Sequence, residues 1–208
     1  ALLQNQINPH FLYNTLACIR GIALSRDVQE IADIAADMAA LYRYSIKGGG
    51  SARLRDELDI VRRYLEIMNA RMDGRFCVRF EVPEALGEAS VPKMILQPLV
   101  ENAVSHGLEG KLGHGTVRII VENSDRTFFL RVRDDGVGMP DEQVERLNAQ
   151  FESGKDAGMT QQYGGIALRN VNSRIRLMFG EDYGLHLFSA AGVGTECCVT
   201  LPLHFREA

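Results

Sequence analysis

The spacing of apolar residues changes once along this chain, and that change constrains the fold more than any other feature. Over residues 1–72, apolar side chains recur at three- and four-residue steps, as they do along amphipathic helices. From residue 73 onward, runs rich in β-branched and aromatic residues alternate with further helical segments. The sequence therefore predicts an α+β protein with a helical module, 1–72, and a second module, 73–208, in which helices cover one face of a mixed sheet.

Two apolar stripes mark the second and third helices of the first module. A flexible turn at 47–51 separates the two helices and permits an antiparallel hairpin. The third helix carries a second stripe at Ile60, Tyr64 and Ile67, which predicts burial on two sides. Stripes of this kind are usually core and need a partner surface, which a second subunit can also supply. The main stripes are Ile31, Ile34, Met38, Leu41 and Ser45, and then Leu54, Leu58, Val61, Leu65, Met68 and Met72.

The second module reads as five strands and three helices. Alternating patterns predict strands at 75–82, 116–122, 127–133, 184–189 and 196–201. Helical spacing predicts helices at 94–104, 141–148 and 166–179. The polar, Gly-rich segment 150–163 has little periodicity and is predicted to be a mobile loop.

Four short motifs occur in fixed order across the second module. They are LVENA at 99–103, DDGVG at 134–138, GGIALRN at 164–170 and GVGT at 192–195. Each is a weak signal alone, because a glycine pair after a strand is usually only a turn. Together they supply a helical amide that can ligate magnesium, a strand-end carboxylate that can accept from an exocyclic amine, and Gly-rich loops that bring backbone N–H groups to phosphates. The combination predicts an ATP pocket.

In this order the motifs resemble the boxes of the GHKL superfamily of ATP-binding domains. Asn102 falls in the N box, Asp134, Gly136 and Gly138 fall in the G1 box, and the later glycines fall in the G2 and last boxes. The resemblance implies a Bergerat-type α/β sandwich that binds ATP and Mg²⁺.

The N-terminal run QINPHFLYNTL, at 6–16, resembles the phosphoacceptor segment of LytS/YesM-type sensor histidine kinases. This resemblance covers nearly the whole chain. It implies autophosphorylation of His10 by ATP, transfer of the phosphoryl group to an Asp of a response-regulator receiver domain, and a homodimer. It also implies a cytoplasmic kinase portion with a membrane-spanning sensor upstream.

His10 and Asn14 are the catalytic candidates. A lone helical histidine is more often an ordinary surface or core residue, but Pro9 directly before it introduces a local penalty that is expected at a functional site. Asn14 lies one turn later on the same helix face, so its amide can orient the imidazole or a water molecule, or simply face solvent. Phe11 stands where many other histidine kinases have an acid, which leaves the proton acceptor unassigned.

The resemblance assigns roles to residues of the predicted pocket. Asn102 is expected to ligate magnesium, His106 to contact the nucleotide, and Asp134 to accept from the adenine amine. Gly136 and Gly138 allow backbone conformations closed to other residues, and Thr195 adds a hydroxyl at the edge of the base. The remaining cofactor-binding candidates are Gly165, Asn170 and Gly194.

The chain departs from the family pattern at several of these boxes. Ser105 stands where a lysine is common, and Tyr163 and Ala167 stand where glycines are common. These changes can remove a phosphate contact or weaken nucleotide affinity. Pro98 occupies the place of the water-activating Glu found in the gyrase, chaperone and mismatch-repair branches, which argues against hydrolysis as the main task.

Composition excludes other classes. Lys and Arg number 23 against 27 for Asp and Glu, with no dense basic block, so a nucleic-acid surface is not expected. The four cysteines lack CxxC spacing, which favours free thiols over a zinc site. No apolar run reaches the length of a membrane helix, so we expect no membrane contact by these residues. Two alternatives to the kinase stay open, a dimeric scaffold that binds nucleotide with little or no turnover and an ATPase clamp.

Overall fold

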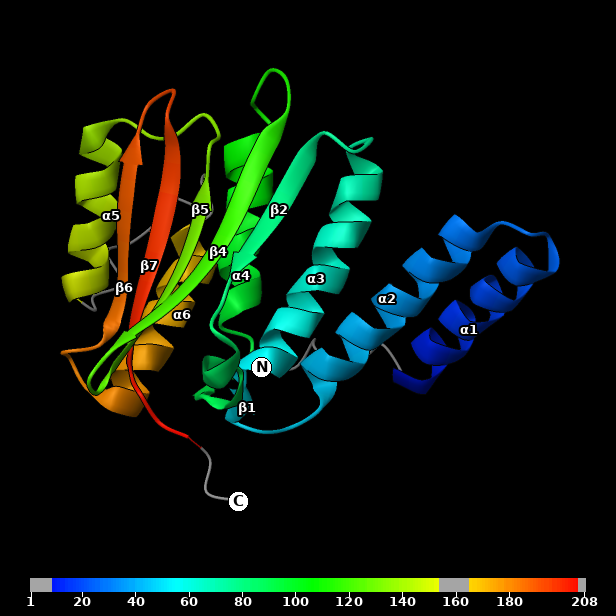
Figure 1. Cartoon of the computed structure of the whole chain (residues 1–208), viewed down its shortest axis with the longest axis horizontal. Coiled ribbons are helices and arrows are strands. Elements are labelled where there is room, and N and C mark those ends of the chain that lie inside the picture. Colours follow the sequence, from blue (N-terminus) through cyan, green and yellow to red (C-terminus); the bar gives the residue numbers. More distant parts are fainter. Residues whose placement is uncertain (1–8, 154–164, 206–208) are drawn as a thin grey trace.

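The N-terminal residues form a pair of antiparallel helices that stands beside the rest of the chain (Figure 1). In this computed structural model the described residues are 9–153 and 165–205. Helix α1 (Pro9–Ser25) and helix α2 (Gln29–Ile46) pack through small side chains, with Ala23, Ala32 and Ala35 buried. Small residues at the contact let the two helix backbones approach closely.

The apolar stripe predicted for α2 is only partly covered by this chain. Ile34 and Leu41 are half-buried, whereas Ile31 and Met38 are 48% and 46% exposed. The stripe lies to one side of the alanines that face α1, so packing within the chain does not account for all of it.

Helix α3 (Leu54–Arg71) is buried on two sides, as predicted. Its first stripe, from Leu54 to Met72, belongs to the hydrophobic core beneath the sheet. Its other side meets α2, where Arg63 pairs with the nearly buried Asp37 at 2.6 Å. The division into 1–72 and 73–208 stays a prediction, since α3 contacts both parts.

A two-stranded antiparallel sheet, which sequence analysis did not predict, joins the modules. Strand β1 (Ser51–Arg53) pairs with β3 (Ser90–Pro92), so that Ala52 lies opposite Val91. The 3₁₀ helix η1 (Glu84–Glu88) leads into β3. Three-residue strands are too short to show a period in the sequence.

The second module contains a five-stranded sheet in the order β2-β4-β5-β7-β6. Its strands are β2 (Phe76–Glu81), β4 (Gly115–Ser124), β5 (Thr127–Asp134), β6 (Gly184–Ala190) and β7 (Gly194–Pro202). Strands β2 and β4 are parallel and the other pairs are antiparallel, so the sheet is mixed, as predicted.

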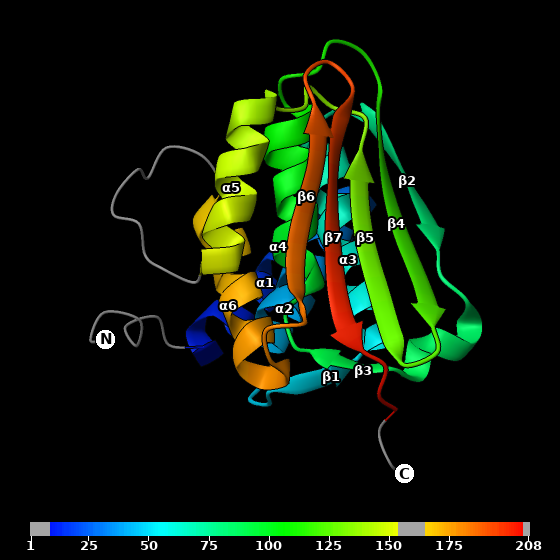
Figure 2. The same cartoon turned by 90° about the vertical axis from the view of Figure 1, so that its left-hand side faces the viewer.

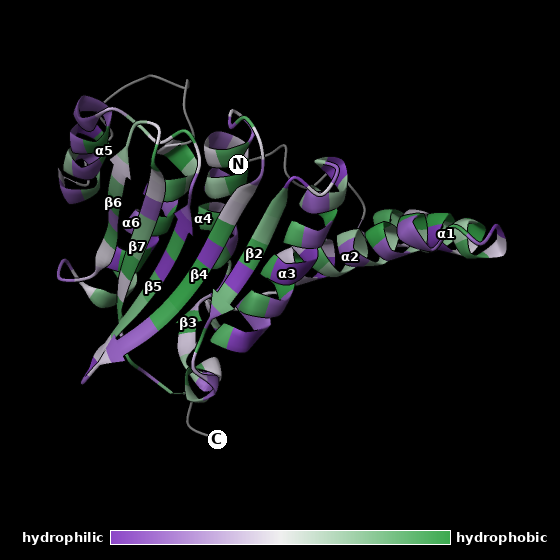
Figure 3. Cartoon of the chain, turned by 45° about the horizontal axis from the view of Figure 1, so that its top comes forward, coloured by the Kyte–Doolittle hydropathy of each residue, from purple (hydrophilic) through white to green (hydrophobic). Residues whose placement is uncertain are grey.

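Helices cover one face of this sheet, which confirms the predicted α/β sandwich (Figure 2). They are α3, α4 (Leu96–Asn102), α5 (Asp141–Ser153) and α6 (Gly165–Phe179). The sheet residues alternate between apolar and polar (Figure 3). On the outer face, Arg118 pairs with Glu81 and Arg131 with Glu122 across neighbouring strands.

Two predicted boundaries differ from the structure. The helix predicted at 141–148 continues to Ser153, so residues 150–153 are helical and not part of a loop. Phe151 is buried there in the core, which explains the extension. The rest of that predicted loop, up to residue 163, lies outside the described residues. The helix predicted at 94–104 begins at Leu96 and continues past Asn102 as a π-helical segment, η2 (Ala103–Leu108).

We expect Leu99→Ala to lower the free energy of unfolding by about 2–5 kcal/mol, because Leu99 is fully buried and truncation leaves a cavity. Chemical denaturation measures this loss. Leu177→Ala, on an 87% exposed residue of α6, is the control and should change stability by less than about 0.5 kcal/mol. Equal losses for the two variants would contradict this account of the core.

Candidate functional site

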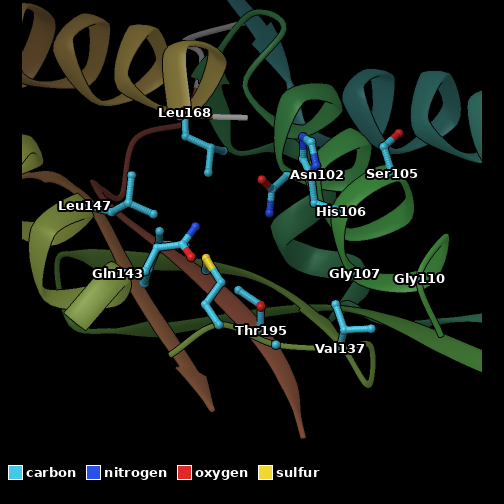
Figure 4. A pocket seen from close by; sticks show the side chains of 14 residues that line it. Asn102, Ser105, His106, Gly107, Gly110, Val137, Gln143, Leu147, Leu168 and Thr195 are labelled. Atoms are coloured by element: carbon cyan, nitrogen blue, oxygen red, sulfur yellow. The ribbon is translucent and has the colours of Figure 1, made fainter. Parts of the chain in front are cut away.

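A cavity of about 370 Å³ lies between the sheet and helices α4, α5 and α6 (Figure 4). Its volume falls in the range of small-molecule sites. Side chains from one wall, including Leu147 and Leu168, are apolar, and the opposite wall is the end of α4 and η2. The lining residues are Asn102, Ser105, His106, Gly107, Gly110, Val137, Gly138, Met139, Gln143, Leu147, Gly165, Leu168, Leu187 and Thr195.

Five residues predicted from the sequence line this cavity. They are Asn102, His106, Gly138, Gly165 and Thr195, which come from four separate motifs. The fold therefore brings together the N box, the G1 box, the start of α6 and the last box.

The π-helical segment η2 shapes the wall that carries His106. The Glu109 N–H donates to the Val104 carbonyl at 3.1 Å, a bond that spans five residues and widens the helix. The Gly107 carbonyl accepts from the Val137 N–H at 3.0 Å, and the Val137 carbonyl accepts from the Gly192 N–H at 2.7 Å. Backbone hydrogen bonds thus connect η2, the G1 loop and the last Gly-rich turn.

Close backbone approach explains the glycines of the G1 motif. Gly138 has φ +64, and a Cβ there would lie 1.9 Å from the Ala190 carbonyl oxygen, so both conformation and space require glycine. Gly136 does not have a positive φ, which corrects the conformational reason predicted for it. A Cβ on Gly136 would lie 2.1 Å from the Gly107 carbonyl oxygen, so its requirement is steric.

Asp134, at the end of β5, is buried behind the cavity lining, with 3% of its surface exposed. Its Oδ1 accepts from the Gly136 N–H at 2.9 Å. Desolvation raises the pKa of this carboxyl to about 6, against hydrogen bonds from the backbone of Gly136 and Thr195 that lower it. A Cβ on Gly107 would meet the carboxylate at 2.5 Å, so only glycine leaves that side of Asp134 uncovered.

The neighbouring Asp135 has the opposite electrostatics. Burial raises its pKa, but hydrogen bonds from Lys111 and from the Thr116 backbone outweigh that effect and hold the pKa below its ordinary value. The Lys111 ammonium lies 2.8 Å from Asp135 Oδ1 and the Thr116 N–H donates to the same oxygen at 2.8 Å. Asp135 therefore anchors the G1 loop to β4.

Ser189 is a site residue that sequence reasoning missed. Its hydroxyl oxygen accepts from the Met139 N–H at 2.9 Å and lies 2.9 Å from Thr195 Oγ1, and its O–H donates to the Gly194 carbonyl at 2.8 Å. A lone serine near the end of a strand gave no signal, because its role depends on pairing between β6 and β7.

The side chains on the N-box wall point in different directions (Figure 4). The Asn102 amide projects into the cavity beside the exposed His106 ring. Glu101 instead accepts a hydrogen bond from Gln97 at 2.8 Å and is not among the lining residues. Burial desolvates the Tyr64 phenol of α3 and raises its pKa to about 12, while the neighbouring Ser105 lowers it.

The remaining predicted residues lie elsewhere. Gly194 is buried with φ +130 between the cavity floor and Asp134, where a Cβ would lie 2.1 Å from the Asp134 carbonyl oxygen. Asn170 and Ala167 are exposed on α6 and are not lining residues. Gly164 and Tyr163 lie outside the described residues.

His10 and Asn14 lie together on α1, away from the cavity. Asn14 Nδ2 lies 3.3 Å from His10 Nδ1, and both side chains are exposed. As the four-residue spacing predicts, Asn14 lies on the same face of α1 as His10, one turn later.

The chain matches two family models in succession. Residues 1–76 match the histidine kinase model, and residues 87–204 match the model of histidine kinase-, DNA gyrase B- and HSP90-like ATPases. The chain belongs to the GHKL histidine kinases of the LytS/YesM type.

Individual relatives agree with this family. The chain is 33% identical over 201 residues to sensor histidine kinase YesM of Bacillus subtilis, covering 96% of the chain and 32% of YesM. It is 29% identical over 203 residues to sensor protein LytS of the same organism, covering 97% of the chain and 33% of LytS. The chain spans about a third of the length of these relatives.

A solved structure shares the fold of the GHKL region and the helices before it. The histidine kinase domain of the Erythrobacter litoralis EL346 blue-light activated histidine kinase superposes with a TM-score of 0.52 at 16% identity. The match covers 93% of this chain and 96% of that domain. Among the described residues of this chain, no helix has both the length and the apolar character needed to cross a membrane.

We expect Asp134→Asn to stabilise the nucleotide-free chain at neutral pH. The pKa of the carboxyl rises from 3.8 to about 6 on folding, so the folded state binds more protons between these values and loses stability as pH rises through them. The ionised form costs ~3 kcal/mol above that window, and an uncharged amide removes the cost. Urea unfolding at pH ~4.5 and ~7.5 measures the slope for both proteins.

Asp135→Asn is the matched control, because the pKa of Asp135 is lowered and its ionised form is favourable in the folded chain. This variant should lose stability at neutral pH. Parallel pH profiles for the native chain and Asp134→Asn would contradict the assigned cost of burying Asp134.

Proposed function

We propose that this chain is the kinase portion of a two-component sensor histidine kinase, which binds ATP in the cavity and transfers the γ-phosphoryl group to His10. An Asp of a response-regulator receiver domain then takes the group. The observation that carries the proposal is the joining of four nucleotide motifs around one cavity, above a buried carboxylate, in a chain whose first helix presents an exposed His–Asn pair.

The base of ATP is assigned to the end of the cavity near Asp134. The carboxylate can accept from the C6 amine of adenine, and guanine, which has a carbonyl oxygen at C6, would leave it unpaired at a cost of ~1–3 kcal/mol. Thr195, held by Ser189 at 2.9 Å, presents a hydroxyl at the base edge. Leu147, Leu168 and Leu187 supply apolar surface for the ring.

The phosphates are assigned to the end near Asn102, His106 and Gly165. The N-terminal turn of α6 begins at Gly165, and its backbone N–H groups favour an anion. The Asn102 amide, directed into the cavity, fits a magnesium ion that takes few protein ligands beside phosphate oxygens. When bound, the ion neutralises charge on the phosphates.

His10 is the proposed nucleophile. A lone pair on one ring nitrogen attacks the γ-phosphorus, the bond to the bridging oxygen breaks, and ADP leaves. Asn14 can orient the ring, because its Nδ2–H, 3.3 Å from His10 Nδ1, donates to that nitrogen in the tautomer that carries the proton on Nε2. The ring is exposed on α1, so a γ-phosphoryl group can reach it.

Pro98 supports transfer over hydrolysis. It lies one turn before Asn102, where ATPase branches of the superfamily place a water-activating carboxylate. A scaffold that binds nucleotide without turnover is the alternative that the test below separates. Because ATP is the substrate, we also propose that the chain works in the cytoplasm.

We further propose that the chain forms a homodimer through α1 and α2. Exposed apolar side chains lie on both helices, among them Phe11 and Ile22 on α1 and Ile31 and Met38 on α2. Ile31 and Met38 are seven residues apart and so lie on one helix face. A second hairpin packed on this face would complete a four-helix bundle.

With γ-labelled ATP and Mg²⁺, we expect the native chain to gain label that survives alkali and is lost in acid, as phosphohistidine does. His10→Gln should abolish the label because it removes the nucleophile, and Asn102→Ala should reduce it by at least ~100-fold by removing a metal ligand. Scintillation counting after gel separation measures both.

The controls are His114→Gln and Asn123→Ala, which change exposed residues outside the cavity. Both should keep native labelling. Label that persists in His10→Gln would mean that another residue is the phosphoacceptor. Tight ATP binding without label in the native chain would favour the scaffold.

A double variant, Ile31→Glu with Met38→Glu, should dissociate the dimer and leave ATP affinity unchanged. Each apolar side chain of this size contributes ~1.5–3 kcal/mol when buried, so the dimer dissociation constant should rise at least ~100-fold. Sedimentation velocity measures the change. Leu112→Glu, on a 98% exposed residue, is the control, and a dimeric double variant would place the interface elsewhere.

A further inference from the structure

Glu57 is a buried acid that the proposed mechanism does not use. It lies on α3 with 1% of its surface exposed, and its carboxylate faces the start of α4. Oε1 accepts from the Met94 N–H at 2.7 Å, and Oε2 accepts from the N–H groups of Ile95 and Leu96 at 3.0 and 3.3 Å. One side chain therefore satisfies three backbone donors of a different element.

These donors lie at the start of the helix that carries Asn102, since Leu96 is its first residue and Met94 and Ile95 directly precede it. Helix α4 has Ile95 at its N-cap and makes no side-chain cap of its own. The first N–H groups of a helix need a partner, and an anion there also interacts favourably with the helix dipole. Glu57 supplies both from α3, so the start of α4 is fixed by a residue outside it.

The last turn of α2 contacts the same carboxylate. The Tyr44 hydroxyl donates to Glu57 Oε1. The Lys93 ammonium lies 4.8 Å from the centre of the Tyr44 ring and donates to the carbonyl of Lys47, the residue at the C-terminus of α2. The end of α2 and the start of α4 are thus joined by buried polar groups.

Helix α6, which starts at Gly165, reaches the same place. Arg174 Nη2 donates to the Met94 carbonyl at 3.0 Å, and the charge of Glu57 acts on the guanidinium. Both elements that are proposed to hold the phosphates therefore reach the segment that Glu57 binds, α4 directly and α6 through Arg174.

We propose that Glu57 is a positioning residue for the nucleotide site, and that the Tyr44 hydroxyl makes this position depend on α2. A displacement of the last turn of α2 removes one hydrogen bond from the carboxylate and loosens the start of α4, which shifts Asn102. The inference rests on the proposed function for its consequence, because Asn102 is assigned there to the metal and phosphates.

A purely structural cap would behave differently. It would lower stability, while the surviving folded molecules would bind nucleotide normally. A positioning residue changes the nucleotide affinity and the KM for ATP of the folded chain, and Tyr44→Phe probes this with the loss of one hydroxyl. Tyr42→Phe is the matched control, because Tyr42 lies on the same helix and packs on Tyr13.

The test measures Mg²⁺–ATP affinity, the KM for ATP in His10 labelling, and hydrogen exchange of the amides at 94–96. For Tyr44→Phe we expect about threefold to tenfold weaker nucleotide binding and faster exchange at 94–96. For Glu57→Gln we expect at least about tenfold weaker binding, because the amide keeps one acceptor oxygen and loses the charge. Tyr42→Phe, and Glu66→Gln on an exposed site of α3, should match the native chain.

Native affinity in Tyr44→Phe with unchanged exchange would overturn the link to α2. Native affinity in Glu57→Gln, or a loss of stability alone, would overturn the positioning role. If the native chain binds ATP without labelling His10, the proposed function fails, and the affinity and exchange measurements still decide the role of Glu57. If Glu57→Gln does not fold, Tyr44→Phe decides alone.

Discussion

The burial of the Asp134 carboxylate is the constraint on which the candidate site depends. The residue is 3% exposed, and backbone N–H groups hold it in place. The backbone segments around Asp134 pack very close to it and to one another, and the glycines at 107, 136 and 194 make that approach possible. The same close approach produces the hydrogen bonds from Val137 to Gly107 and from Gly192 to Val137. Burying this acid costs free energy, and in return the carboxylate can accept a hydrogen bond from a ligand's N–H.

Helix α3 carries the second constraint, because it packs on two partners at once. One side fills the core under the sheet and the other side meets α2 through Arg63 and Asp37. A helix packed on both sides moves together with its partners, because close-packed interiors change between discrete arrangements and do not deform continuously. Tyr64 extends the contact to Ser105 on the cavity wall, and Glu57 extends it to α4. Helix α3 therefore belongs to the helical part through one side and to the nucleotide-binding part through the other.

Much of this architecture could be predicted from the sequence, because its helices and strands have strong periods. The strand with Phe76 and Phe80 and the stripe from Leu54 to Met72 are examples. What the sequence could not predict depends on tertiary pairing. The π-helical segment η2 gives no local signal and is held by the hydrogen bond from the Val137 N–H of the G1 loop to the Gly107 carbonyl. Ser189 and Glu57 carry no local signal, since their partners lie in other elements. For Gly136 the residue type was predicted and the reason was not, because steric contact across two loops leaves no trace in a local pattern.

The place of His10 bears on how transfer can proceed. His10 is exposed on α1, outside the cavity, and α1 packs on α2 (Figure 1). Bringing the cavity to the His10 of its own chain by a swing at 47–51 would part α2 from α3 and α4. That motion would separate Tyr44 from Glu57 and Arg63 from Asp37, so it would remove a hydrogen bond from a buried acid and break an ion pair. Delivery to the His10 of a second copy leaves these contacts intact. For the proposed kinase we therefore infer that the contacts between α2 and α3 favour transfer between subunits of the proposed dimer.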